Sequence, residues 1–272
     1  MIFFPNAKIN IGLFITSKRA DGYHNLESVF YPIGLSDILE IKEKTPNDPW
    51  FANTGIPVDS LPEQNLCYRA FELMREKYHI PPVTFHLHKI IPFGAGLGGG
   101  SSDAAFTLKA LNRLFQLNLD TPALKKLALQ LGSDCPFFID NHPAFVWEKG
   151  NRMESLGLSI QGKHVVVVVP PLIIPTPEAY RHVTPRKRAG SLKNILTHTP
   201  VEKWHQKVHN DFEDSVFKEK PELKEIKRML YMEGALFASM SGSGSAVYGI
   251  FNDPPLRQEV FSGYYVWSGQ LD

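Results

Sequence analysis

A glycine-rich segment at residues 92–102 constrains the fold of this chain more than any other feature. It reads Pro92-Phe-Gly-Ala-Gly-Leu-Gly-Gly-Gly-Ser-Ser102, with five glycines in eleven residues. Because glycine loses more conformational freedom on folding than other residues, this density indicates positive-φ positions and a backbone that approaches a ligand closely. A strand pattern precedes the segment at 83–88, and an amphipathic helical pattern follows at 101–115. Backbone amides of such a loop and helix start bind anions, so we expect a phosphate cradle here.

Other interpretations of this segment fit the sequence less well. A Walker loop requires Gly-Lys-Ser/Thr, and no lysine follows these glycines. A dinucleotide fingerprint can be traced as Gly94-x-Gly96-x-x-Gly99, but the strands before it have an antiparallel pattern. A merely flexible turn is disfavoured because the segment joins a strand to a helix with its own capping residues, Ser101, Ser102 and Asp103.

The rest of the chain predicts antiparallel strands at the start and mixed helices and strands afterwards. The expected strands are 7–16, 28–44, 83–88, 163–170 and two short ones within 237–251. The expected helices are 65–78, 101–115, 121–131 ended by Gly132, and 221–232 begun by Pro221. Ala20-Asp21-Gly22 favours a tight hairpin. We place a domain boundary near residues 150–160, which divides the chain into residues 1–155 and 156–272.

Composition restricts the classes of function. The 272 residues carry 29 basic and 28 acidic side chains, so no global charge attracts nucleic acid, and Arg186-Lys-Arg188 is only a short basic cluster. The densest apolar run, Val165–Val169, is far shorter than the about 20 residues that span a bilayer. The two cysteines, Cys67 and Cys135, favour a reducing, cytoplasmic location. We therefore expect neither a nucleic-acid partner nor a membrane role.

Three motifs resemble those of the GHMP kinases, named for galactokinase, homoserine kinase, mevalonate kinase and phosphomevalonate kinase. They are Pro5-Asn-Ala-Lys-Ile-Asn10, the segment Pro92–Ser102, and Met240-Ser-Gly-Ser-Gly-Ser-Ala246, in the order of the family. The resemblance implies an α+β fold of two domains. The N-terminal domain would be of the ribosomal protein S5 type and bind ATP, and the C-terminal domain would be ferredoxin-like and bind substrate. It also places the active site in the cleft between them.

The same resemblance implies an ATP-dependent phosphotransferase that acts on an alcohol, with Mg²⁺ bound alongside ATP. It gives Asp134 the role of the base that accepts the hydroxyl proton, and Lys8 the role of stabilising developing negative charge. Taken without the family, Lys8 could be a snorkelling surface lysine and Asp134 a helix N-cap. The residues that the resemblance assigns to ATP are Pro92, Phe93, Gly94, Ala95, Gly96, Leu97, Gly98, Gly99, Gly100, Ser101 and Ser102.

Within the family, Ala20-Asp-Gly-Tyr-His24 and Gly132-Ser-Asp-Cys-Pro136 most resemble members with a cytidyl diphosphate substrate. The residues implied for that substrate are Asn10, Tyr23, His24, Phe30, Tyr180, Ser241 and Gly242. The aromatic side chains among them would stack on the pyrimidine, although Tyr23 and Phe30 taken singly would more often be core residues. The chain departs from the family at Glu148–Glu154, where a glycine-rich stretch is usual, so substrate contacts there are open. His86 and His88 alternate on a strand, but no third metal ligand is evident, and we expect no metal site of the protein's own.

Two other hypotheses stay open at this point. A GHMP kinase for a mevalonate-like or sugar alcohol would show no dependence on a cytidine group. A non-catalytic nucleotide-binding or regulatory protein would have no physical need for both Lys8 and Asp134. Nucleic-acid binding is disfavoured because the sequence has no extended basic face.

Overall fold

The structure is a computed structural model that describes residues 1–58, 62–186, 188, 190–254 and 258–271. Lys187 of the expected basic cluster lies outside them. By their contacts the residues form two compact units, which we call unit 1 (residues 1–7, 35–93 and 98–141) and unit 2 (residues 8–34, 94–97 and 142–272). Each unit is described by itself.

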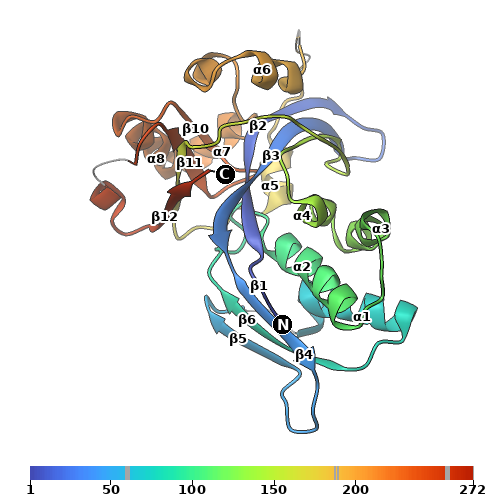
Figure 1. The fold of residues 1–272 in the computed structure, drawn as a ribbon. Helices are drawn as coiled ribbons and strands as arrows, with labels where there is room; N and C mark the ends of the chain where they lie inside the picture. Colours follow the sequence, from blue (N-terminus) through green and yellow to red (C-terminus); the bar gives the residue numbers. More distant parts are fainter. Residues whose placement is uncertain (59–61, 187, 189, 255–257, 272) are drawn as a thin grey trace. The chain divides into compact units, whose positions relative to one another are not determined.

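Figure 1 labels most of the helices and strands along the chain. The strands are β1 (Ile2–Phe3), β2 (Asn6–Lys18), β3 (His24–Ser36), β4 (Ile38–Glu43), β5 (Phe51–Gly55), β6 (Val83–Lys89), β7 (Ala144–Glu148), β8 (Arg152–Ser155), β9 (His164–Val169), β10 (Phe237–Met240), β11 (Val247–Phe251) and β12 (Tyr265–Gln270). The α-helices are α1 (Leu66–Tyr78), α2 (Gly99–Leu114), α3 (Thr121–Leu131), α4 (Cys135–Asp140), α5 (Thr176–Arg181), α6 (Leu192–His198), α7 (Glu213–Glu219) and α8 (Pro221–Met232). Short 3-10 turns occupy Pro62–Gln64, Val201–Gln206 and Gln258–Phe261.

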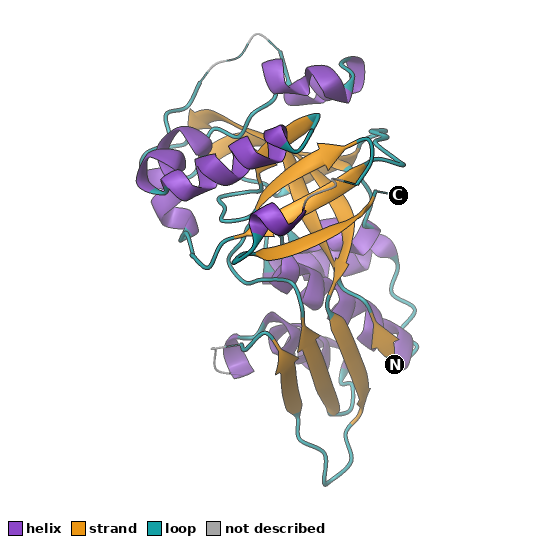
Figure 2. Cartoon of the chain, turned by 90° about the vertical axis from the view of Figure 1, so that its left-hand side faces the viewer, coloured by secondary structure: helices purple, strands orange, loops and turns teal. Residues whose placement is uncertain are grey.

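Unit 1 contains a sheet of strand order β1-β4-β6-β5. Strands β4 and β6 are antiparallel, whereas β5 and β6 are parallel. Alternation along β6 turns Val83, Phe85 and Leu87 inward, and all three are buried. Helices α1 and α2 lie on one side of this sheet (Figures 1 and 2) and cover that apolar face. Asn65 caps α1 by accepting a hydrogen bond from the backbone N–H of Cys67 at 2.8 Å.

Unit 2 contains the sheet β10-β11-β9-β12 and most of a second sheet, β2-β3-β7-β8. Strand β9 lies between β11 and β12, which explains why His164–Val169 consists almost entirely of buried valines. Helix α8 begins at Pro221 and buries Leu223, Ile226 and Leu230 on one stripe. This stripe packs against the sheet in one apolar core with Val166, Val168 and other buried side chains of β10 and β11. Figure 2 shows the strands of this sheet lying side by side.

Most predicted elements are found, with two corrections. The run 28–44 is two strands, β3 and β4, separated at Asp37, whose buried carboxylate accepts hydrogen bonds from the backbone N–H groups of Ile90 (2.6 Å) and Ile91 (2.8 Å). The predicted capping of the loop helix by Ser101, Ser102 and Asp103 is wrong. Helix α2 begins two residues earlier, after Gly98, which is the N-cap and provides no side chain.

The expected division at residue 155 stays a prediction, since the compact units follow contacts rather than one cut in the chain. Within the described ranges, no helix combines the length and apolar character needed to cross a membrane.

Candidate functional site

The glycine-rich loop has a backbone that only glycine adopts readily. Gly94, Gly96 and Gly98 have φ values of +62°, +77° and +72°, and the side chains of Ala95 and Leu97 between them are buried. Residues 94–97 belong to unit 2, where the carbonyl of Ala95 accepts from the N–H of Ala246 at 3.1 Å and that of Leu97 from the N–H of Lys8 at 3.0 Å. The three predicted motifs are therefore joined by backbone hydrogen bonds within this unit.

Gly96 shows why a side chain is excluded from the loop. A Cβ atom at this position would lie 2.0 Å from the carbonyl oxygen of Ser241 and 2.8 Å from its carbonyl carbon. These are backbone atoms, so a side-chain rotation cannot relieve the overlap. The close approach brings the loop against Ser241-Gly-Ser-Gly244, the link between β10 and β11 that we call the 241–244 turn.

Lys8 is a buried cation rather than a surface lysine. Lys8 is only 3% exposed, and its Nζ donates to Oδ1 of Asn10 at 2.5 Å and to the carbonyl of Gly96 at 2.9 Å. The ammonium also lies 4.6 Å from the centre of the Phe30 ring. A snorkelling lysine would be solvated at its head, so that interpretation is wrong. The structure brings together Lys8, Asn10, Phe30 and Gly96 of the predicted site.

Asn10 is fixed by hydrogen bonds on every side. Its Nδ2 donates to Oγ of Ser28 at 2.8 Å, and its carbonyl accepts from the hydroxyl of Tyr248 at 2.8 Å. Its backbone N–H donates to Oγ of Ser241 at 3.2 Å, and that hydroxyl donates to the Gly96 carbonyl at 2.9 Å. Ser28 and Tyr248 were not predicted, because a serine and a tyrosine in apolar strands give no signal of a shared partner.

Two of the predicted aromatic residues lie face to face. The rings of His24 and Tyr180 are stacked with centroids 5.2 Å apart, and Tyr180 makes an edge contact with Phe212 at 4.8 Å. Partial burial, with a smaller effect from the charge of Lys18, lowers the pKa of His24. The lowered pKa favours the neutral imidazole, which can donate one hydrogen bond and accept another.

Tyr23 has a different environment at the tip of the β2–β3 hairpin. Its residue is 63% exposed, and the Lys149 ammonium lies 5.0 Å from its ring centre. Lys149 also pairs with Asp21 at 3.6 Å. Lys149 lies in the segment 148–154 that departs from the family pattern, and this segment is the turn and second strand of the β7–β8 hairpin. The departure therefore places a lysine beside a predicted substrate residue.

Asp134 belongs to unit 1, at the start of α4. It occupies the N-cap position, yet its side chain makes no capping hydrogen bond, and Oγ of Ser133 donates to its carboxylate at 3.3 Å. Helix capping therefore does not account for this carboxylate.

Unit 1 also contains a buried ionic cluster that the sequence interpretation missed. The ammonium of Lys89 is paired with the carboxylates of Asp37 and, at 2.8 Å, Asp103, and all three residues are buried. Burial raises the pKa of Asp103 to about 7, although the charge of Lys89 acts in the opposite direction. Burial alone would lower the pKa of Lys89, but the two carboxylates outweigh this effect, and the pKa of Lys89 is raised. The alternation that turns Phe85 and Leu87 inward turns Lys89 inward too, so period-two reasoning could have identified it.

The cluster lies beneath the start of α2. A Cβ atom at Gly99 would be 2.9 Å from Nζ of Lys89, so the first residue of the helix rests on the ammonium. In contrast, the N-cap Gly98 offers no side-chain acceptor to the first N–H groups of α2. These groups and the helix dipole suit an anion outside the helix.

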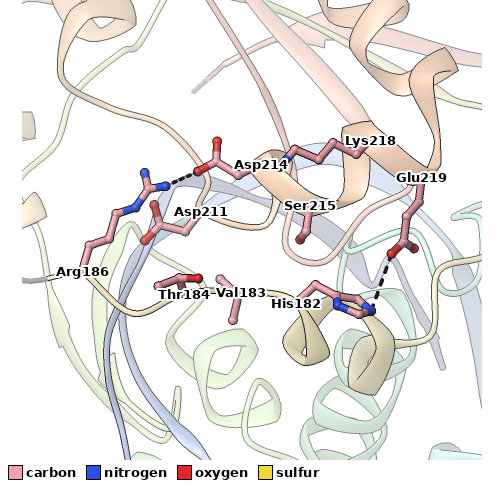
Figure 3. Close-up of a pocket in the computed structure, with 9 residues that line it drawn as sticks. All are labelled: His182, Val183, Thr184, Arg186, Asp211, Asp214, Ser215, Lys218 and Glu219. Carbon is pink, nitrogen blue, oxygen red and sulfur yellow. Dashed lines mark hydrogen bonds and ion pairs between the residues drawn. The ribbon is translucent and has the colours of Figure 1, made fainter.

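A separate cavity of about 440 Å³ in unit 2 is not lined by any predicted site residue. Two ion pairs lie among its lining side chains (Figure 3), Arg186 with Asp214 at 2.6 Å and His182 with Glu219 at 3.7 Å. Two residues of the expected basic cluster thus form ion pairs, Arg186 with Asp214 and Arg188 with Asp211.

His86 and His88 share one hydrogen-bond partner, Thr54. Their ring nitrogens lie 3.0 and 2.9 Å from the hydroxyl of Thr54. Within the described part of the chain, no group of three or more His, Cys, Asp or Glu side chains is placed to hold a metal ion.

Comparisons with known proteins identify the class. The family described as "GHMP kinases N terminal domain" matches residues 65–149, and "GHMP kinases C terminal" matches residues 192–264. The chain therefore belongs to the GHMP kinases. The resemblance drawn from the three motifs is confirmed, and so is the α+β fold.

Individual relatives within this family carry more specific names. The chain is 48% identical to a Parabacteroides distasonis protein named 4-diphosphocytidyl-2-C-methyl-D-erythritol kinase, over 100% of both chains. A protein of the same name from Cytophaga hutchinsonii is 45% identical over 94% of both. A crystal structure of 4-(cytidine 5'-diphospho)-2C-methyl-D-erythritol kinase superposes with a TM-score of 0.82 at 35% identity, covering 100% of this chain and 99% of that one. A homoserine kinase from Cytophaga hutchinsonii, at a TM-score of 0.70 and 14% identity over 98% and 94% of the two chains, shares the fold alone.

Proposed function

We propose that this chain transfers the γ-phosphoryl group of ATP to the 2-hydroxyl of 4-diphosphocytidyl-2-C-methyl-D-erythritol, a step of the non-mevalonate isoprenoid precursor pathway. The products are the 2-phosphate and ADP. The observation that carries the proposal is the 48% identity, over the full length of both chains, to a kinase with this substrate in its name. The buried Lys8 and the stacked rings of His24 and Tyr180 support it independently, because each suits one part of that reaction.

ATP is the phosphate donor of GHMP kinases, generally with Mg²⁺, and the residues of this chain fit it. The loop of residues 92–102 would hold the phosphates through backbone N–H groups, since its glycines leave the backbone open and α2 begins without a side-chain cap. Bound Mg²⁺ supplies charge neutralisation on the phosphate oxygens. We assign it no ligands among the residues of this chain.

Lys8 and Asp134 are assigned to the chemistry of phosphoryl transfer. The oxygen of the 2-hydroxyl bonds to the γ-phosphorus, the bond from that phosphorus to the β–γ bridging oxygen breaks, and ADP leaves. Asp134 accepts the hydroxyl proton, consistent with a carboxylate that is not used to cap α4. Lys8 stabilises negative charge, and its fixed position means that little reorganisation is needed at the moment of transfer.

The cytidyl diphosphate substrate would bind mainly in unit 2. We assign Tyr23 and Tyr180 to the faces of the pyrimidine, with Phe30 as a further aromatic contact, and His24 to its polar edge. Asn10, Ser241 and Gly242 would contact the diphosphate or the methylerythritol part. The support is that Asn10 and Ser241 are hydrogen-bonded to one another beside Lys8.

The finer expectations remain part of the proposal. A division into an ATP-binding domain (1–155) and a substrate-binding domain (156–272) is supported by the two family matches, which lie on either side of residue 155. A cytoplasmic location is supported by the two free, buried cysteines, Cys67 and Cys135. The charge pairing of Arg186 and Arg188 supports the absence of a nucleic-acid partner.

The test is ADP release by the purified protein with ATP and Mg²⁺. We expect turnover with 4-diphosphocytidyl-2-C-methyl-D-erythritol and none with mevalonate or homoserine. Turnover on another alcohol would retain the kinase and reject the cytidyl site. ATP binding without turnover on any acceptor would support the regulatory hypothesis instead.

A further inference from the structure

The 241–244 turn is held by a segment distant in sequence, Asn210-Asp-Phe-Glu213, which we call the 210–213 segment. Nδ2 of Asn210 donates to the carbonyl of Met240 at 2.9 Å and to that of Gly242 at 2.7 Å. Its Oδ1 accepts from the N–H of Phe212 at 3.0 Å. The residue is 1% exposed. The two side-chain N–H groups of Asn210 are therefore used on the end of β10 and on the turn, and neither can be replaced by water without opening the core.

Glu213 holds the strand that leads into the turn. Its Oε1 accepts from the N–H of Met240 at 2.8 Å and from Oγ of Ser239 at 3.0 Å. Its Oε2 is paired with the ammonium of Lys227 at 2.6 Å. Asn210 and Glu213 together fix residues 239–242 through two carbonyls, one N–H and one hydroxyl.

The 241–244 turn also determines the surroundings of Lys8. Oγ of Ser241 donates to the Gly96 carbonyl at 2.9 Å, and the ammonium of Lys8 donates to the same oxygen at 2.9 Å. The hydroxyl of Ser241 also accepts from the N–H of Asn10, whose Oδ1 accepts from the Lys8 ammonium. Any movement of Ser241 therefore affects the Gly96 carbonyl and the side chain of Asn10, two groups that accept hydrogen bonds from the Lys8 ammonium.

The turn has no internal substitute for this support. Its own hydrogen bonds run from Ser241 N–H to Ala246 and from Gly244 N–H to Ser241, which shape the loop but do not locate it against Gly96. Asp211, between Asn210 and Phe212, is directed elsewhere: it accepts from the N–H of Ile15 at 2.7 Å and lines the cavity of Figure 3. Asn210 and Glu213 therefore hold the end of the turn at residues 239–242, whereas its other end is held by the contact of Ser243 with Thr176 at 3.2 Å and by the hydrogen bond from the N–H of Ala246 to the Ala95 carbonyl.

We propose that Asn210 is a positioning residue for phosphoryl transfer, acting through Ser241 and Gly96 on the Lys8 ammonium. The inference rests on the proposed function for its catalytic consequence. It predicts that loss of the Asn210 amide lowers kcat through displacement of the Lys8 ammonium. It also predicts a smaller rise in the KM of the cytidyl substrate through Gly242, because the pyrimidine is assigned to other residues, His24 and Tyr180.

The test compares Asn210→Ala and Asn210→Asp with Asp214→Asn as the matched control. Asp214 lies on the same stretch of chain, is exposed, and points to Arg186 rather than to the turn (Figure 3). At a temperature where circular dichroism shows every variant folded, we expect kcat of Asn210→Ala to fall about 10- to 100-fold, as a small misplacement of a catalytic group can cause. The control should stay within about twofold. Asn210→Ser, which can still donate one hydrogen bond, replaces Asn210→Ala if the latter does not fold.

A pH profile separates positioning from simple destabilisation. In Asn210→Asp a buried carboxylate would face two carbonyl oxygens, so its pKa is expected to rise, and its protonated form could donate one hydrogen bond. The kcat of Asn210→Asp relative to wild type should therefore increase as pH falls. The same ratio for Asn210→Ala should not change.

Hydrogen exchange gives a readout independent of activity. Peptides covering residues 237–251 should exchange faster in Asn210→Ala than in wild type, whereas the control should match wild type. Unchanged exchange, or wild-type kcat in a folded Asn210→Ala enzyme with only a lower Tm, would overturn the inference. If wild type itself fails to turn over the cytidyl substrate, the proposed function fails, and the exchange experiment alone decides whether Asn210 locates the turn.

Discussion

Replacement of Gly96 by alanine should be far more damaging than an ordinary glycine substitution. Its φ of +77° would cost an alanine about 1–2 kcal/mol. The added Cβ would also lie 2.0 Å from the Ser241 carbonyl oxygen, so the turn would have to move by more than about 1 Å to restore van der Waals contact. Forced repacking of this kind costs about 1–3 kcal/mol more. The sum is about 2–5 kcal/mol of unfolding free energy.

Gly162 provides a matched control for this substitution. Its φ is +81°, but nothing lies within 4 Å of a Cβ added there, so Gly162→Ala carries the backbone cost without the overlap. Thermal unfolding should therefore place the Tm of Gly96→Ala about 2–10 °C below that of Gly162→Ala. ADP release should be lost in Gly96→Ala and retained in Gly162→Ala. Equal Tm values, or an active Gly96→Ala enzyme, would refute the argument that the loop and the 241–244 turn touch at this residue.

Three further predictions concern Asp134, Tyr180 and Asp103. Asp134→Asn should lower kcat by about 10²- to 10⁴-fold with nearly unchanged ATP affinity, and unchanged turnover would remove Asp134 from the mechanism. Tyr180→Ala should raise the KM of the cytidyl substrate about 3- to 10-fold while Tyr180→Phe does not, and equal KM values would exclude stacking on Tyr180. The folded-state pKa of Asp103, about 7, exceeds the unfolded value of 3.8, so wild-type stability should fall as pH rises between them. Urea unfolding at pH 5 and pH 8 should show Asp103→Asn gaining stability relative to wild type at the higher pH, and a pH-independent difference would contradict this.

Local patterns predicted the elements whose interior is decided by side-chain periodicity. Three elements were predicted correctly: the valine-rich strand β9, the helix begun by Pro221 and the helix ended by Gly132. Side-chain burial, the fixed φ of proline and helix termination by glycine all act within a few residues. The break at Asp37 could not be found in this way. It depends on N–H groups of Ile90 and Ile91, more than fifty residues away, which a strand pattern does not encode.

The start of α2 shows a second limit. Ser101, Ser102 and Asp103 are better capping residues than glycine, but Gly98 in a left-handed conformation lets the loop enter the helix earlier. Asp103 is instead drawn inward by Lys89. Local capping preference is outweighed there by an ion pair formed through the tertiary fold.

The candidate site was predicted unevenly for the same reason. Motifs indicated Lys8, Asn10 and Ser241. In the structure Lys8 and Ser241 both donate to the Gly96 carbonyl, and Asn10 is hydrogen-bonded to each of them. Asn210 escaped notice because a single asparagine before an acidic residue looks like an ordinary turn, and its bond to the Phe212 N–H is such a turn. Its two bonds to the 241–244 turn become visible only when the strands are folded together.

The most direct test of the account is the position of the transferred phosphate, determined by ³¹P NMR of the product formed from ATP and 4-diphosphocytidyl-2-C-methyl-D-erythritol. C2 of the methylerythritol part carries the methyl branch, so its hydroxyl is tertiary and a phosphate there has no vicinal proton. The account predicts a new phosphomonoester signal without proton coupling, formed in step with ADP. A signal split by neighbouring protons would place the phosphate on another hydroxyl, and the absence of any new signal would contradict the proposed transfer.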